Sequence, residues 1–249
     1  MQYTRGRKAT LLLTFAFIII YVFSLVFIVR NHEKEIRDYI AVRDTLYVNS
    51  YENTISSYER FSNYIFYSRI NQDTILRMMS QANASNESQR AQIRNQLYDF
   101  LKEEYLFTQE YNFRQLHFHL PNGDSFLRFH SPDRFGDNLF SVRESIRRAN
   151  TEETYVSGFE EGRIFNGYRF VYPLSFEGEH VGTVEVSISM MSILEDLSRS
   201  ELPRDMGFIL DRQVMSDTVF IEEQGRYEIS PISEHFVTDT EIDALMAQS

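Results

Sequence analysis

The stretch QLHFHLPNGDSFLRFH, residues 115–130, alternates polar and apolar side chains on both sides of a turn sequence. Side chains of a β-strand point alternately to its two faces, so this alternation predicts two strands. Between the strands, Asn122-Gly123 favours a two-residue type I′ turn, because both residues tolerate positive φ. The stretch therefore predicts a β-hairpin. The expected cross-strand pairs are Leu120 with Ser125, His119 with Phe126, His117 with Arg128, and Gln115 with His130.

The predicted hairpin has one apolar and one polar face. The apolar face is expected to pack on helices and holds Leu116, Phe118, Leu120, Leu127 and Phe129. The other face holds Gln115, His117, His119, Phe126, Arg128 and His130. Three imidazoles and a guanidinium suit a small-ligand pocket in which Arg128 binds a carboxylate through both of its terminal nitrogens. The same face fits a solvated sheet equally well.

Two further strands are expected at residues 168–174 and 181–188, and a helix at 141–150 is suggested by the capping-box pair Ser141 and Glu144. Another short helix is expected at 192–200, and a strand beginning at 207 opens a second module near Leu202. Four charged residues in or beside these strands complete the candidate ligand site or pair with Arg128. They are Glu160, Arg163, Arg169 and Glu185.

Glycine and proline are distributed unevenly along the 249 residues. No glycine lies between Gly6 and Gly123, and the first proline is Pro121. Because both residues break helices, the first half is expected to be helical and the second half to be rich in turns. The spacing of apolar residues predicts a long helix over residues 32–79 and a second helix around 93–106, with a polar loop at 81–88 between them. The absence of cysteine excludes disulfides and thiolate metal sites.

Residues 9–29 are uncharged and apolar, and they are long enough to cross a bilayer. Arg5, Arg7 and Lys8 precede them, which predicts a cytoplasmic tail at residues 1–8 and an uncleaved signal anchor. Residues 30–249 are then extracytoplasmic. The formal net charge of −11 argues against nucleic-acid binding.

A family resemblance rests on the hairpin motif together with Phe135-Gly136-Asp137-Asn138-Leu139, the segment 158–163, Tyr168-Arg169 and the segment 181–185. In this order, these motifs resemble those of a double Cache sensor domain of the third subtype. The resemblance implies an α/β (α+β) fold: a long N-terminal transmembrane and periplasmic helix, a PAS-like antiparallel sheet module, and the start of a second, membrane-proximal module. The expected boundaries are 30–112 for the long and second helices, 113–200 for the membrane-distal module and 201–249 for an incomplete proximal one.

The resemblance also implies a function: the ligand-sensing region of a histidine kinase, diguanylate cyclase or chemoreceptor in the bacterial inner membrane. Such a receptor would bind a small, anionic ligand and pass the signal through a long helix that also forms a homodimer. The chain ends at Ser249 without a second apolar span, which fits a fragment or a truncated receptor.

Two alternatives remain. A membrane-anchored metalloenzyme would use His117, His119 and His130, although Arg128 would place a cation beside the metal. A scaffold without a ligand would instead bind a partner protein. Since the sequence contains no nucleophile elbow, Walker loop or zinc-protease helix, we expect no catalysis, cofactor or metal in this segment.

Overall fold

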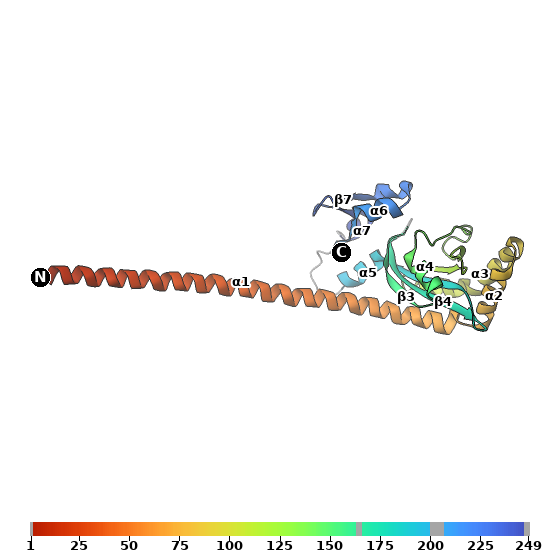
Figure 1. Cartoon of the computed structure of the whole chain (residues 1–249), viewed down its shortest axis with the longest axis horizontal. Helices are drawn as coiled ribbons and strands as arrows, with labels where there is room; N and C mark the ends of the chain where they lie inside the picture. Colours follow the sequence, from red (N-terminus) through yellow and green to blue (C-terminus); the bar gives the residue numbers. More distant parts are fainter. Residues whose placement is uncertain (1, 163–165, 200–206, 247–249) are drawn as a thin grey trace. The chain divides into compact units, whose positions relative to one another are not determined.

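The computed structural model describes residues 2–162, 166–199 and 207–246, and the chain divides into two units, residues 1–52 and 53–249. The N-terminal unit is part of one continuous helix, α1 (Gln2–Ile65), shown as a single rod in Figure 1. The side chains of residues 13–29 are exposed, and the apolar segment of this helix reaches a mean hydropathy of 2.4. By length and composition the helix can cross a membrane. The expected continuity between the apolar segment and the helix after it is confirmed.

The expectation that this helix runs to residue 79 is wrong. After Ile65 the chain forms a π-helical turn, η1 (Phe66–Ile70), and then enters α2 (Asp73–Ala84). The turn buries Phe66, whose ring stacks on that of Tyr172 with centroids 4.2 Å apart, so a tertiary contact ends the helix without glycine or proline.

The expected loop at 81–88 shrinks to two residues, because α3 (Glu87–Gln109) begins directly after Asn86. The Asn86 side chain accepts a hydrogen bond from the backbone of Gln89, and the Gln89 side chain accepts one from the backbone of Asn86. This reciprocal capping box marks the start of the helix.

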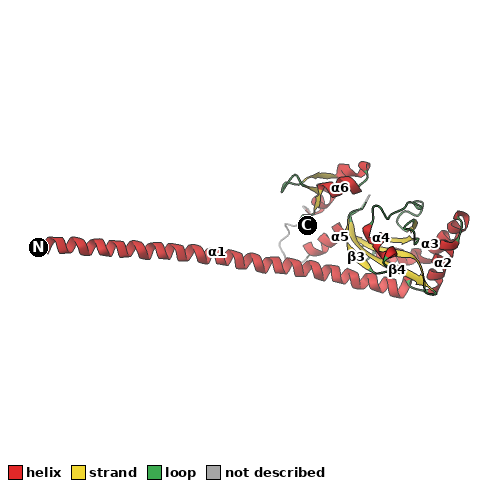
Figure 2. Ribbon diagram, in the orientation of Figure 1, coloured by secondary structure: helices red, strands yellow, loops and turns green. Residues whose placement is uncertain are grey.

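Five antiparallel strands form the main sheet in the order β2-β1-β5-β4-β3. They are β1 (Phe113–His119), β2 (Ser125–Arg128), β3 (Val156–Glu160), β4 (Gly167–Phe176) and β5 (Glu179–Ser189). On one face, Tyr172 of β4 bonds to Ser62 of α1, α2 contacts β4 and β5, and α3 contacts β1 and β2. On the opposite face, Thr183 accepts a hydrogen bond from Asn150 of α4 (Glu144–Thr151), the short helix beside the strands in Figure 2. Covering on both faces explains why residues 181–188 of β5 are all buried.

The expected hairpin forms, but its turn differs from the prediction. His117 faces Arg128 as expected, whereas His119 pairs with Ser125 rather than Phe126 after an irregularity in β1. Pro121 has no N–H, so it cannot pair with Asp124 to close a two-residue turn. Instead the N–H of Leu120 donates to the Asp124 carbonyl, and Gly123, at φ +85°, donates to the Leu120 carbonyl. The ladder also ends at Arg128, so Gln115 and His130 form no strand pair.

Residues 207–246 contain a second, three-stranded sheet in the order β6-β8-β7. Its strands are β6 (Ile209–Asp211), β7 (Tyr227–Ile229) and β8 (Phe236–Asp239). The strand expected after residue 207 is therefore confirmed. The helices α6 (Arg212–Thr218), η2 (Ile221–Arg226) and α7 (Thr240–Met246) complete the segment, and α5 (Met190–Ser198) follows β5 before it. The Tyr227 hydroxyl donates to Glu161 of the segment after β3 at 3.4 Å.

Candidate functional site

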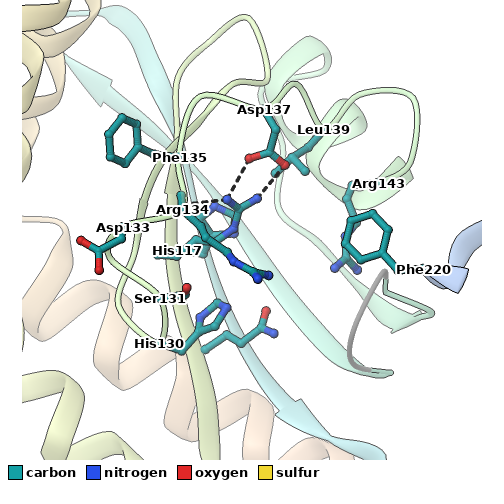
Figure 3. Close-up of a pocket in the computed structure, with 12 residues that line it drawn as sticks. His117, His130, Ser131, Asp133, Arg134, Phe135, Asp137, Leu139, Arg143 and Phe220 are labelled. Carbon is teal, nitrogen blue, oxygen red and sulfur yellow. Dashed lines mark hydrogen bonds and ion pairs between the residues drawn. The ribbon is translucent and has the colours of Figure 1, made fainter. Parts of the chain in front are cut away.

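A cavity of about 550 Å³ lies on the α4 side of the main sheet (Figure 3). Its floor is formed by β1 and β2, one wall by the connection between β2 and α4, and part of its rim by Phe220 from the C-terminal segment. The lining residues are Gln115, His117, Arg128, His130, Ser131, Asp133, Arg134, Phe135, Asp137, Leu139, Arg143 and Phe220. The sequence predicts the cavity residues that lie on the floor but not those of the wall.

Arg128 binds a carboxylate through both terminal nitrogens, and that carboxylate belongs to the protein. Its Nη1 and Nη2 lie 2.8 and 2.9 Å from the two Asp137 oxygens, and Nη1 also donates to the Arg134 carbonyl at 2.8 Å (Figure 3). Arg128 thus fixes the wall of the cavity to β2, and its charge is balanced by Asp137. This differs from the expected role of Arg128 as the partner of a ligand carboxylate.

Two other arginines present their charge to the cavity. Arg134 is exposed, and its guanidinium makes no hydrogen bond or ion pair with any residue in the described ranges. The Arg143 side chain is only 13% exposed, lies 3.6 Å from Glu160 and donates to the Glu161 carbonyl at 3.3 Å. Burial lowers the pKa of Arg143 to about 10, which leaves it positively charged at neutral pH.

The helix that follows Arg143 begins later in the chain than the sequence predicts. The expected start at Ser141 is wrong, because α4 begins at Glu144 with Arg143 as its N-cap residue. Glu160 of β3 replaces the expected side-chain cap: its oxygens accept hydrogen bonds from the backbone and the hydroxyl of Ser145 at 3.0 and 2.8 Å. A carboxylate at this end of a helix is favourable because it satisfies unpaired N–H groups.

Three imidazoles gather at the cavity floor. The ring of His117 packs against that of His119, with centroids 4.0 Å apart, and lies 6.5 Å from that of His130. Burial lowers the pKa of each: well below its ordinary value for His117, to about 3 for His119 and to about 4 for His130. All three are therefore neutral at pH 7. Within the described part of the chain, Nε2 of His119 and Nδ1 of His130 are buried without a hydrogen-bond partner.

A buried ion pair lies beneath this floor. Nη1 of Arg169 contacts Oε1 of Glu185, and the same guanidinium lies within 3.3 Å of Gln115 and Glu160. Burial alone would raise the pKa of Glu185, but Arg169 and Arg143 outweigh that effect and lower it to about 2. Both side chains are 1% exposed, so neither meets solvent directly.

The structure separates the residues predicted for the site into four groups. His117, Arg128 and His130 line the cavity, whereas His119, Arg169 and Glu185 are buried next to that floor, and Glu160 lies at the start of α4. Phe126 does not line it: its ring packs under the guanidinium of Arg94 from α3, 5.3 Å away. Arg163 lies outside the described residues.

Sequence reasoning missed Arg134, Asp137, Arg143 and Phe220 as site residues. A sequence signal for Asp137 exists, because it is an acidic residue that follows the hairpin arginine Arg128 by nine positions. Nothing in the local sequence indicates Phe220, which reaches the cavity from the C-terminal segment 207–246.

Comparison with known families identifies the class of protein to which this fold and cavity belong. Residues 52–224 match the dCache_3 family, the double sensory domain of two-component sensor kinases. The chain belongs to this family, so it contains a ligand-sensing receptor region, as the motif resemblance implied. No curated protein matches the chain.

Several solved sensor domains are similar to this chain at low sequence identity. The ligand-binding domain of the Campylobacter jejuni chemoreceptor Tlp3, in complex with 4-methylisoleucine, is 14% identical; the match covers 68% of each chain, with a TM-score of 0.42. The Escherichia coli DcuS sensor domain is 8% identical over 60% of this chain and 98% of its own, with a TM-score of 0.41. The Vibrio cholerae DctB histidine kinase sensor domain is 17% identical over 62% and 61%, with a TM-score of 0.34.

Proposed function

We propose that the cavity binds a small anionic ligand and that the chain is the sensing region of a bacterial transmembrane receptor. The observation that carries this proposal is the pair Arg134 and Arg143, two cationic side chains on a cavity of about 550 Å³. This volume is typical of small-molecule sites. A scaffold that binds only a protein partner has no need of such a cavity, so the small ligand is the better-supported alternative.

Arg134 and Arg143 differ in what an anion would gain from them. The Arg134 guanidinium has no partner in the described ranges, so a carboxylate or phosphate could bind it without breaking a protein contact. Arg143 is largely buried and held by the Glu161 carbonyl, and in such surroundings a charge–charge interaction is stronger than in water. Phe135, Leu139 and Phe220 supply apolar surface for the remainder of the ligand.

His117 and His130 add neutral hydrogen-bonding groups to this site, and Arg128 holds its wall in place. His119, Glu160, Arg169 and Glu185 support the floor from behind. We extend the ligand-binding role to Arg163 as well, on the strength of the sequence motif alone.

The signal would leave the sensing module through α1. On the helix-facing side of the sheet, Ser62 bonds to Tyr172 of β4 at 2.6 Å, and the Tyr155 hydroxyl donates to Glu59 at 2.7 Å. Tyr58 donates to Asp196 of α5 at 2.6 Å, which connects α1 to the helix that leaves the main sheet. A ligand that favours one arrangement of the sheet would shift these contacts, and helix shifts of about 1–2 Å are a known switching mode.

Within residues 1–249, the proposed receptor crosses the bacterial inner membrane through one segment. Residues 1–8 are cytoplasmic, 9–29 cross the membrane, and 30–249 lie in the periplasm. The segment 113–200 forms the membrane-distal module and 201–249 part of the proximal one. The receptor is a homodimer through the long helix, and its output is that of a histidine kinase, a diguanylate cyclase or a chemoreceptor, in a two-component or chemotaxis pathway. The sensing region itself performs no catalysis.

The test is a thermal-shift and calorimetric screen of the full chain in detergent with small mono- and dicarboxylates, amino acids and inorganic phosphate. At least one anionic compound should stabilise the chain, and Arg143→Ala should abolish the effect. Arg147→Ala is the matched control, because Arg147 lies one turn later on α4 and pairs with Glu144 at the surface.

Three outcomes would overturn the proposal: no compound binds, Arg143→Ala and Arg134→Ala bind as tightly as the parent, or Arg147→Ala loses binding equally. The first outcome would favour the scaffold alternative.

A further inference from the structure

Two imidazoles and a carboxylate converge below the cavity floor. His117 of β1 faces Glu185 of β5 directly, and His119 lies two residues further along the same face. One potential ligand atom from each of the three side chains lies within 4.8 Å of the other two. All three residues are buried, at 4%, 0% and 1% exposure for His117, His119 and Glu185. The geometry therefore places three metal-binding side chains around a common point.

Each imidazole is held by a hydroxyl group through one of its nitrogens. Nε2 of His117 lies 2.8 Å from Oγ of Ser125, and Nδ1 of His119 lies 3.0 Å from Oγ1 of Thr183. Metal-binding histidines are oriented in this way, with one nitrogen hydrogen-bonded and the other on the metal. The second nitrogen of His119, Nε2, is buried with no partner in the described ranges. A buried polar atom of this kind costs free energy unless something binds it.

The surrounding charges do not exclude a cation. Arg128 faces His117, but Asp137 binds its guanidinium through both oxygens. Arg169 donates to Oε1 of Glu185, and a carboxylate can bind a metal through its second oxygen while the first accepts from an arginine. Since His117 also lines the cavity, a metal ion has a route of entry.

We propose that His117, His119 and Glu185 bind a divalent transition-metal ion of the zinc class at the floor of the cavity. Imidazole nitrogens with one carboxylate oxygen are a donor set that zinc accepts, and three protein ligands leave a fourth coordination position. That position is available to water or to an anionic group of a ligand in the cavity. The ligand set differs from that of the metalloenzyme alternative, because Glu185 replaces His130 and no catalytic step is involved.

The test uses the full chain in detergent, purified without a polyhistidine tag and freed of metal by chelation. Titration with Zn²⁺, and with Co²⁺ as a spectroscopic probe, should give one bound ion per chain with the visible absorption of low-coordinate Co²⁺. X-ray absorption of the Zn²⁺-loaded chain should show two imidazole ligands. This last measurement requires no variant, so it decides the proposal even where a substitution prevents folding.

Variants then assign the ligands. His119→Gln should abolish binding, and Thr183→Val, which removes the hydroxyl that orients His119, should weaken it by about 10–100-fold. His235→Gln, at an exposed histidine, is the matched control and should bind as the parent does. Absence of a bound ion, fewer than two imidazoles in the absorption spectrum, or unchanged binding by folded His119→Gln would overturn the proposal. Arg134→Ala should leave metal binding intact, which separates this result from failure of the anion site.

Discussion

The packing of β5 against β1 leaves no room for a side chain at Gly182, and substitution there should be costly. A Cβ atom at Gly182 would lie 2.1 Å from the carbonyl oxygen of His119 and 3.4 Å from Cε of Met79. Because ordinary contact begins at about 3.4 Å, β1 would have to move by roughly 1 Å at His119. The backbone at Gly182 also has φ +132°, which side chains rarely adopt.

These two effects together set the loss of unfolding free energy expected for Gly182→Ala. Backbone strain costs about 1–3 kcal/mol and overpacking of a rigid site a further 1–3 kcal/mol, so the variant should lose about 2–6 kcal/mol of unfolding free energy. Gly178→Ala is the matched control in the same β4–β5 hairpin: its φ is +85°, but nothing lies within 4 Å of the added Cβ. It should show the strain alone, about 1–2 kcal/mol.

The measurement is guanidinium unfolding of the full chain in detergent, followed by circular dichroism and tyrosine fluorescence. The unfolding midpoint of Gly182→Ala should fall well below that of Gly178→Ala. Since β1 carries His117 and His119, Gly182→Ala should also lower the affinity for a ligand or metal ion at the cavity floor. Gly178→Ala should leave that affinity unchanged. Equal midpoints for the two variants would refute the close approach of β5 to His119.

Two further predictions concern the charged groups of the site. Arg169→Met should destabilise the chain by about 3–5 kcal/mol, because it leaves Glu185 buried without its partner. Guanidinium unfolding at pH 7 measures the change in unfolding free energy. A loss of unfolding free energy below about 1 kcal/mol would contradict the buried pair. His130 has a folded pKa of about 4 against an ordinary value of 6.5, so the unfolded chain takes up its proton first and stability falls as pH drops below about 6.5. Between pH 7 and 5 this proton uptake lowers the free energy of unfolding by about 2 kcal/mol. The variant His130→Asn should lack this loss. An identical pH dependence in parent and variant would show that His130 is not buried in its neutral form.

The parts of the fold that follow from local pattern could be predicted from the sequence. Alternation at 115–120 and 125–128 gives β1, β2 and their polar and apolar faces, because a strand's period of two is a property of its backbone. The absence of glycine and proline from residues 7–120 correctly indicates helix as far as Gln109, where α3 ends. It cannot locate η1, because that turn depends on the contact of Phe66 with Tyr172, more than a hundred residues away.

The candidate site could be predicted only where it lies on the hairpin. Its cationic wall depends on two long side chains whose partners no local pattern specifies. The turn after β2 is held by Arg128 on Asp137 and by Arg94 of α3, whose guanidinium lies 3.5 Å from the centre of the Phe135 ring. An arginine that faces a polar surface can bind a ligand or fix a neighbouring loop, and sequence alone does not distinguish these roles. Arg128 fixes the loop, and among the described residues Arg134 and Arg143 are the other two arginines that line the cavity.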